Sequence, residues 1–153
     1  MPRRRKTWRE KMETVKEPKI VNDPKGRGKM LIPTPRLVDV LVRQIPRGKV
    51  STSTEIRRKL AEDFNVDLAC PLATGWFIKI VAGAAEEELR MGAEIGKVAP
   101  YWRVVKPNGR LPEKYPVSPS ILAERLRVEG VKIAEKRGKL YVSPLEDFLY
   151  KFS

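Results

Sequence analysis

The sequence predicts a mostly α-helical protein with a small β-wing, arranged as a winged helix-turn-helix. Four segments between residues 35 and 128 carry apolar residues at helical spacing. Turn signals at Asn108-Gly109 and Arg137-Gly138 flank the last of these segments and predict hairpins. Three helices, a hairpin, a helix and a second hairpin are typical of a winged helix, in which the third helix reads a nucleic-acid groove.

The charge of the chain predicts an anionic partner. Lys and Arg number 32 against 19 Asp and Glu, which gives a formal net charge of +13 on 153 residues. Nucleic acid is the commonest partner for such an excess, and an anionic membrane surface is the alternative. The chain has no run of 18 apolar residues and no signal peptide, so we expect an intracellular protein of the cytoplasm, associated with the nucleoid.

Residues 1–30 are interpreted as a basic arm, followed by one domain over residues 31–153. The arm holds eleven basic and four acidic residues, a net charge of +7. Helical spacing predicts a short helix over residues 7–16, and prolines and glycines from residue 18 onward are expected to prevent regular structure. The arm is either a solvated tail or a segment that follows phosphates by charge. Trp8 either docks the arm on the domain or stacks on a base.

The helices of the domain have recognisable starts. Thr34 is the expected N-cap of the first helix and Pro35 its first residue. A Ser/Thr run precedes the second helix, and Ser118-Pro119 begins the fourth, which Gly130 ends. The helices are expected over residues 35–45, 53–64, 73–90 and 119–128, with extended chain over 98–105 and a terminal helix over 144–152. The first helix is expected to bury Leu37, Val40, Leu41 and Ile45.

The residue types exclude several chemistries. The chain contains no histidine and one cysteine, Cys70. It therefore has no internal disulfide, no Cys/His zinc site and no Ser-His or Cys-His nucleophile. We expect no metal and no cofactor.

Four landmarks of the chain occur in an order known from one family. They are Ile45–Ile56, Ala82-Gly83-Ala84, Pro100–Val105 with Asn108-Gly109, and Glu129-Gly130. Over residues 34–135 the chain resembles the C-terminal, DNA-binding domain of the O6-alkylguanine-DNA alkyltransferases and their alkyltransferase-like relatives. The landmarks look like the family's IPxGxVxTYGEI turn, its small-residue recognition helix, its PCHRVV active-site segment with the wing turn, and its LLxxEG helix end.

The departures from the family concern its chemistry. Tyr101 occupies the position of the acceptor cysteine and Trp102 that of the histidine that activates it. A tyrosine with a pKa of about 10 is a poor nucleophile near neutral pH. Glu129 is retained, but its thiol partner is absent. We therefore expect no catalytic residue, and transfer of an alkyl group to Cys70 is the least favoured hypothesis.

Two hypotheses follow for the segment at Tyr101. In the first, a non-catalytic alkyltransferase-like protein binds double-stranded DNA, recognises an alkylated guanine and marks it for repair proteins, as a monomer. In the second, aromatics plug the former pocket of a general DNA- or RNA-binding module. The first hypothesis assigns the lesion pocket to Tyr101, Trp102, Arg103 and Glu129.

The resemblance also assigns the DNA-binding residues. A helix start beside phosphate, a gap-filling side chain on the third helix and basic wing residues are the expected contacts. Lys79 is the nearest charged candidate to fill the gap of an extruded base, and Trp76 or Phe77 could act as an apolar wedge. Ser53 replaces the family's phosphate-contacting tyrosine. The assigned residues are Ser51, Thr52, Ser53, Thr54, Trp76, Phe77, Lys79, Gly83, Lys106 and Arg110.

Overall fold

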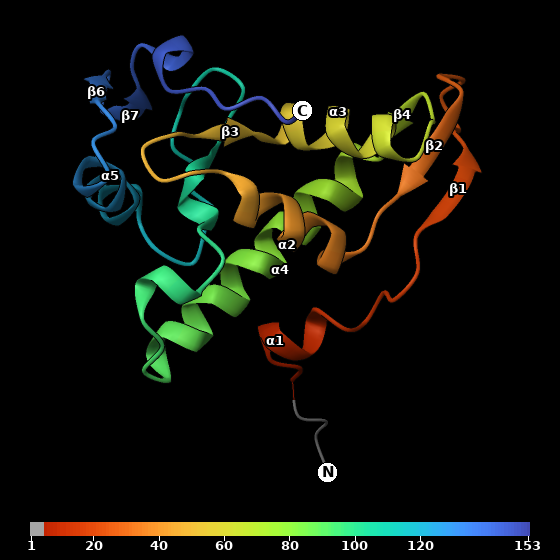
Figure 1. The fold of residues 1–153 in the computed structure, drawn as a ribbon, viewed down its shortest axis with the longest axis horizontal. Helices are drawn as coiled ribbons and strands as arrows, with labels where there is room; N and C mark the ends of the chain where they lie inside the picture. Colours follow the sequence, from red (N-terminus) through yellow and green to blue (C-terminus); the bar gives the residue numbers. More distant parts are fainter. Residues whose placement is uncertain (1–4) are drawn as a thin grey trace.

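The computed structural model describes residues 5–153, so Arg3 and Arg4 of the predicted arm lie outside the described residues. Helices surround a long central helix, α4 (Pro71–Arg90) (Figure 1). Of the three small sheets, two lie at opposite ends of the molecule and the third, whose strands are buried, lies between them. The predicted mostly α-helical architecture with small β-elements is confirmed. Among the described residues no helix is long and apolar enough to cross a membrane.

The capping residues place the helices as predicted. The hydroxyl of Thr34 accepts from the Leu37 backbone N–H at the start of α2 (Pro35–Gln44). Thr52 caps α3 (Ser53–Asp63), and Ser118 caps α5 (Pro119–Val128). The predicted starts of these three helices are confirmed. The predicted third helix corresponds to α4, which begins two residues earlier than expected, because a proline at its first position is compatible with a helix start.

The buried face of α2 differs from the predicted one. The helix buries Val38, Leu41 and Val42, whereas Val40 is 54% exposed. The apolar residues of this helix are nearly contiguous, so spacing alone allowed two overlapping faces, and packing against α4 selects the one with Val38 and Val42.

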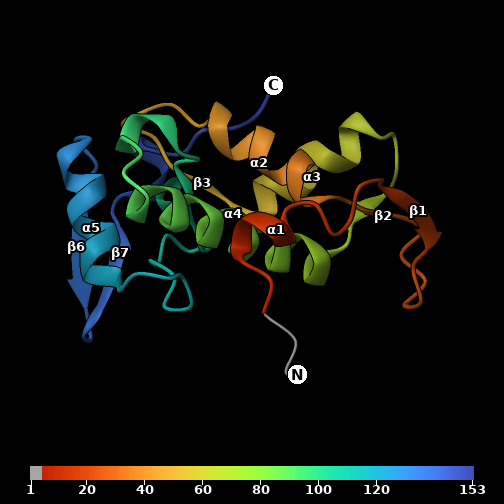
Figure 2. The ribbon, with the colours of Figure 1, turned by 90° about the horizontal axis from the view of Figure 1, so that it is seen from below.

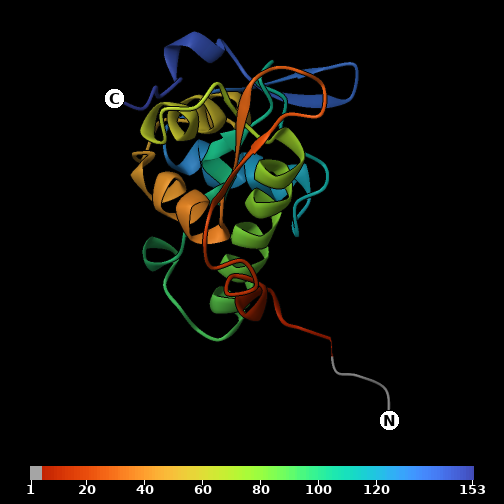
Figure 3. The same cartoon turned by 90° about the vertical axis from the view of Figure 1, so that its right-hand side faces the viewer.

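The predicted absence of regular structure in the arm beyond its first helix is wrong. Strands β1 (Lys19–Asn22) and β2 (Lys29–Ile32) form an antiparallel hairpin, and β2 pairs in parallel with β4 (Leu68–Ala69). Figure 3 shows this hairpin on the side of the molecule that faces the viewer. The carboxylate of Asp23 accepts two backbone N–H groups and an Arg27 hydrogen bond in the turn, which lowers its pKa to about 2. This acceptor organises a turn that Pro and Gly content alone does not predict.

The predicted short helix over 7–16 is shorter than expected. Helix α1 spans Trp8–Lys11 and packs against α4.

The segments around residue 100 and at the C-terminus also differ from prediction. Residues 98–105 are not extended throughout, because the 3-10 turn η2 (Tyr101–Arg103) precedes β5 (Val104–Val105). Another 3-10 turn, η1 (Ile95–Lys97), comes just before this segment. The terminal helix is reduced to the 3-10 turn η3 (Leu145–Asp147). The chain beyond η3 exchanges backbone hydrogen bonds with Val50, at 2.9 and 2.7 Å, and these strand-like bonds replace helical ones.

The remaining strands lie beside the aromatic segment. Strand β3 (Ser51–Thr52) pairs in parallel with β5. The predicted hairpin near Arg137-Gly138 is confirmed as β6 (Ile133–Lys136) and β7 (Lys139–Val142). The turn at Asn108-Gly109 forms, but the chain that follows it pairs with β7, through Leu111 N to Leu140 O at 2.9 Å.

Candidate nucleic-acid interface

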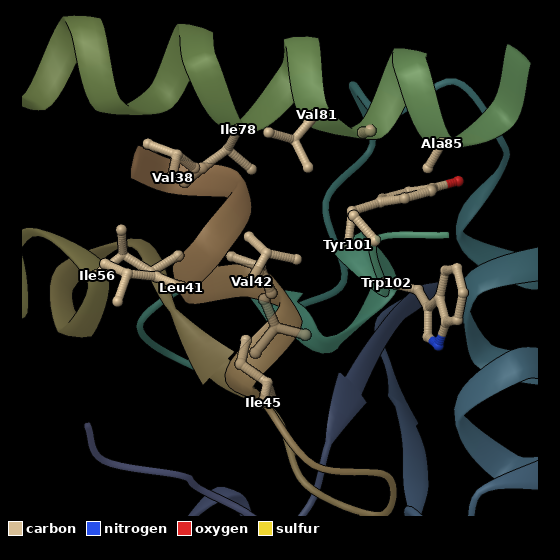
Figure 4. Close-up of a cluster of buried hydrophobic side chains, with 14 of the residues drawn as sticks. Val38, Leu41, Val42, Ile45, Ile56, Ile78, Val81, Ala85, Tyr101 and Trp102 are labelled. Carbon is tan, nitrogen blue, oxygen red and sulfur yellow. The ribbon is translucent and has the colours of Figure 1, made fainter. Parts of the chain in front are cut away.

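Turn η2 buries Tyr101 in the core, and the nearly buried Trp102 beside it lines a hollow of about 340 Å³ together with Arg103 and Glu129. In Figure 4 the Tyr101 ring lies under α4 near Ala85, and Trp102 lies beside it. Their exposed fractions are 0% and 2%. The two rings meet edge to face at 5.5 Å, and Tyr115 meets Tyr101 in the same way at 5.2 Å. Burial of this size makes these rings part of the packed interior.

The hydroxyl of Tyr101 is held by an ion pair between α4 and α5. It donates to Glu86 at 2.8 Å, and Arg125 donates to the same carboxylate at 2.7 Å and to the hydroxyl at 3.2 Å. Burial and the hydrogen bond to the Glu86 carboxylate raise the pKa of Tyr101 well above its ordinary value. Burial alone would raise the pKa of Glu86, but the bonds from Arg125 and Tyr101 outweigh it and lower that pKa. Tyr101 therefore stays protonated at neutral pH.

A second carboxylate holds the indole of Trp102. Glu129 accepts from Trp102 Nε1 at 3.0 Å and from Arg103 at 2.8 and 2.9 Å. Arg103 also donates to the Ile45 carbonyl at 2.7 Å. Burial opposes ionisation of Glu129, but these bonds prevail and lower its pKa. The Glu129 carboxylate thus links Trp102 and Arg103, and the fourth predicted lesion-pocket residue, Tyr101, packs against Trp102.

The hydroxyl of Tyr101 is poorly placed to act as a nucleophile. Tyr101 is enclosed and protonated, and the chain contains no histidine that could activate it. Cys70 lies at the N-cap of α4, sixteen residues before Glu86 on the same helix, or about 24 Å along its axis. No cluster of three metal-ligating side chains occurs within residues 5–153.

A groove of about 340 Å³ lies on another side of the aromatic centre, where the N-terminus of α3 meets α4 and β5. Lys79, Lys106 and Lys114 lie on its border, and Tyr115 forms part of its wall. Its other lining residues are Ser53, Gly75, Ile78, Val104, Val105, Pro112 and Glu113. The groove thus combines apolar and aromatic walls with cationic groups.

Three of the predicted DNA-binding residues, Ser53, Lys79 and Lys106, line this groove together. Tyr101 and Trp102 do not line it. Trp76, from the same face of α4 as Lys79, is 47% exposed.

The other predicted DNA-binding residues have structural partners. Ser51 is fully buried and donates to the Tyr150 carbonyl at 3.0 Å, and Thr52 caps α3. Phe77 is 6% exposed and belongs to the core. The remaining three are Thr54, which is exposed, Arg110, which pairs with Glu113, and Gly83, which lies under Trp8.

Sequence reasoning missed two groups of residues at this interface. Tyr115 lies in an irregular loop, and no spacing or motif connects it with α4. Glu86 and Arg125 are separated by 39 residues, so their ion pair had no local signal. For Tyr115 the only available signal was a large aromatic in a polar loop.

Comparisons with known proteins bear on the fold. No family model and no curated protein sequence matches the chain. Solved structures do match. One is S. pombe Atl1 in complex with damaged DNA containing O6-carboxymethylguanine, with 23% identity, a TM-score of 0.54, and coverage of 76% of this chain and 94% of that chain. S. pombe ATL in complex with DNA matches with 22% identity and the same TM-score and coverage. This chain therefore has the fold of the alkyltransferase-like protein Atl1.

Proposed function

We propose that the protein binds double-stranded DNA through α3 and α4 and accepts an extruded alkylated base in the groove between Ser53, Lys79 and Tyr115, without transferring the alkyl group. The groove is the observation that carries the proposal. Its volume of about 340 Å³ falls within the roughly 300–1,000 Å³ of small-ligand sites. Its walls suit a flat, apolar-faced base, and its lysines suit the phosphates on either side.

The arrangement around the groove supports a winged-helix mode of binding. Helix α4 is the third helix of the core; its Lys79 lines the groove, and its Trp76, one turn earlier, is 47% exposed. Either side chain could fill the space that an extruded base leaves in the duplex. The hairpin β6–β7, together with the chain that follows β5, is the proposed wing. The likeness to Atl1, which was solved with damaged DNA, supports the same mode.

The aromatic centre supports a role without catalysis. Tyr101 occupies the sequence position of the family's acceptor cysteine, yet its hydroxyl is enclosed between Glu86 and Arg125. We propose that Tyr101 and Trp102 fill the space behind the groove and stiffen its rear wall through Tyr115. The base then rests against Tyr115 and the β5 valines rather than against Tyr101.

Strand pairing supports a different division of the chain from the predicted one. Strand β2 bonds to β4, so the hairpin from Lys19 to Ile32 belongs to the domain. Helix α1 packs on α4, and Met12 is buried in the core. We propose one domain that includes α1 and this hairpin, acts as a monomer and passes the lesion to repair proteins.

Fluorescence anisotropy tests the proposal with duplexes that contain either O6-methylguanine or guanine, at matched salt. The expected result is tighter binding of the methylated duplex and an affinity that falls steeply with salt. Lys79→Ala should reduce the affinity about tenfold and the salt slope by about one, whereas Lys151→Ala, the same change on the exposed C-terminal tail, should not.

The competing functions give different results in the same experiment. Equal affinity for both duplexes would leave a general nucleic-acid-binding module, and a flat salt dependence would exclude nucleic acid as the partner. Mass spectrometry after incubation with methylated DNA should find the Cys70 peptide unmodified. An alkylated Cys70 would contradict the proposed absence of catalysis.

A further inference from the structure

Helix α1 packs against α4 at Gly83, where the missing side chain leaves a notch in the surface of α4. The indole of Trp8 lies so close to Gly83 that an added Cβ there would be 2.3 Å from the ring. Any larger residue would force the indole away. Figure 2 shows α1 lying across α4, in front of its middle. The small-residue face of α4 therefore accommodates the protein's own N-terminal segment.

Polar contacts fix the orientation of α1 as well. The two carboxylate oxygens of Glu87 accept the backbone N–H groups of Trp8 and Arg9, each at 2.9 Å. Within α1, the side chains of Thr7 and Glu10 each accept the other's backbone N–H, at 3.1 Å. Four N–H groups at the start of α1 thus have acceptors, one pair of them on α4. A short helix with this many specific contacts is docked, not free.

The notch lies on the same stripe of α4 as its exposed residues. Positions 72, 76, 79, 83 and 87 recur every three or four residues, so they share one face. In the N-terminal half of that face Leu72 is 87% exposed and Trp76 is 47% exposed. In the C-terminal half Gly83 lies under α1. A duplex that contacts the exposed half of the stripe therefore reaches α1 next.

Docking of α1 also changes the charge that this stripe presents. The C-terminal half of α4 carries three consecutive glutamates, which would repel phosphate. Glu86 is buried and paired with Arg125, Glu87 accepts the N–H groups of α1, and Glu88 is half-buried. The segment bound to Glu87 presents Arg5, Lys6 and Arg9 as exposed cations. The ammonium of Lys11 lies 4.0 Å from the Trp8 ring centre and 5.8 Å from that of Trp76.

We propose that the DNA-binding surface consists of α4 and of α1 docked on it. The basic residues of α1 contact duplex phosphates beside the groove of the DNA that α4 contacts. This inference rests on the proposed function. The N-terminal segment is then held against α4. Trp8 acts as the positioning residue that keeps the cations of α1 there, and the ligand is the sugar-phosphate backbone of double-stranded DNA.

Gly83→Ala tests the packing of Trp8 against Gly83 without removing any charge or exposed side chain. Alanine is the better helix former, so α4 itself should not be weakened, while the added methyl group displaces Trp8. Gly96→Ala is the matched control, because a Cβ there has nothing within 4 Å. Limited trypsin digestion of the full chain reports docking: Gly83→Ala should speed cleavage after Arg9 and Lys11, and Gly96→Ala should not.

The DNA readout is anisotropy with an unmodified duplex at several salt concentrations. For Gly83→Ala we expect about a tenfold loss of affinity and a salt slope smaller by about two, as for two lost phosphate contacts. Trp8→Ala, which keeps every charge, should give the same changes. The ratio of affinities for the O6-methylguanine and guanine duplexes should stay as in the wild type, because the groove is untouched.

The outcomes separate this inference from the proposed function. Tighter binding by Gly83→Ala would mean that α1 covers a DNA-binding surface and would overturn the inference. Unchanged affinity of Gly83→Ala despite faster cleavage would also overturn the inference. Unchanged cleavage in both Gly83→Ala and Trp8→Ala would overturn it as well. If the wild-type protein itself fails to bind the duplex, the proposed function fails instead.

Discussion

Truncation of Trp102 distinguishes a core residue from a lesion-contacting one. Its ring is 2% exposed, lies 5.5 Å from that of Tyr101, and has the Arg125 guanidinium 5.1 Å from its centre. Replacing a buried tryptophan by alanine costs about 3–5 kcal/mol. Glu129 keeps its two bonds from Arg103, so no buried charge loses all its partners, and we expect about 4 kcal/mol for Trp102→Ala.

Trp102→Phe separates the contribution of the ring from that of its N–H. Phenylalanine keeps most of the apolar volume and the edge contact with Tyr101, but it loses the 3.0 Å bond to Glu129. A hydrogen bond to a charged group contributes about 1.5–3 kcal/mol, and the lower end applies because Arg103 still satisfies the carboxylate. We expect a loss of about 1.5 kcal/mol in the free energy of unfolding.

Urea denaturation measures both variants. With a slope of about 2 kcal/mol per M, the midpoint should fall by about 2 M for Trp102→Ala and by less than 1 M for Trp102→Phe. The O6-methylguanine preference of the folded Trp102→Phe protein should equal that of the wild type. A loss of stability below about 1 kcal/mol for Trp102→Ala, together with a changed lesion preference, would show that Trp102 contacts the lesion and would refute the reasoning.

Three further predictions concern the fold around this centre. Arg125→Met should lower the free energy of unfolding by about 3 kcal/mol, because it leaves the buried Glu86 carboxylate without its cation; urea denaturation measures the loss, and an unchanged midpoint would contradict the role of the pair. Gly109→Ala should cost about 1–3 kcal/mol, because φ there is +87° and a Cβ would lie 2.9 Å from the Val142 carbonyl; thermal denaturation checks it. The pKa values of Glu86 and Glu129 are lower in the folded chain, so their contribution to stability is present above the unfolded-state value of about 4.3 and is lost as the pH falls through the lower folded-state values. The urea midpoint should therefore be level between about pH 5 and 8, where no histidine titrates, and should fall below about pH 4; a midpoint that rises on acidification would contradict this sign.

The helices were predictable because their starts are encoded locally. Thr34, Thr52 and Ser118 each accept a backbone N–H within three residues, so the signal and the structure lie in the same few positions. The arm hairpin was missed because its turn depends on the Asp23 carboxylate, and because β2 is completed by β4, more than thirty residues away. The prediction of a terminal helix was wrong for the same kind of reason, since the backbone of these residues hydrogen-bonds to the distant Val50.

The site was predictable in its parts but not in their grouping. Ser53, Lys79 and Lys106 were assigned through the resemblance to the alkyltransferase family, whose motifs indicate where the helix start, the third helix and the wing lie. The environment of Tyr101 was not, because it is set by Glu86 and Arg125, which lie 15 and 24 residues away on two other elements. Spacing cannot reveal which distant carboxylate satisfies a buried hydroxyl.

The docking of α1 on α4 has a consequence for the order in which the chain folds during its synthesis. Trp8 meets Glu87 across 79 residues of sequence, so α1 has no docking partner until α4 has left the ribosome. At about 5–20 residues per second the N-terminal segment therefore stays unpaired for roughly 4–16 s. Only a chain that has completed α4 can hold these cations in place. Docking of α1 therefore occurs only after α4 has been synthesised.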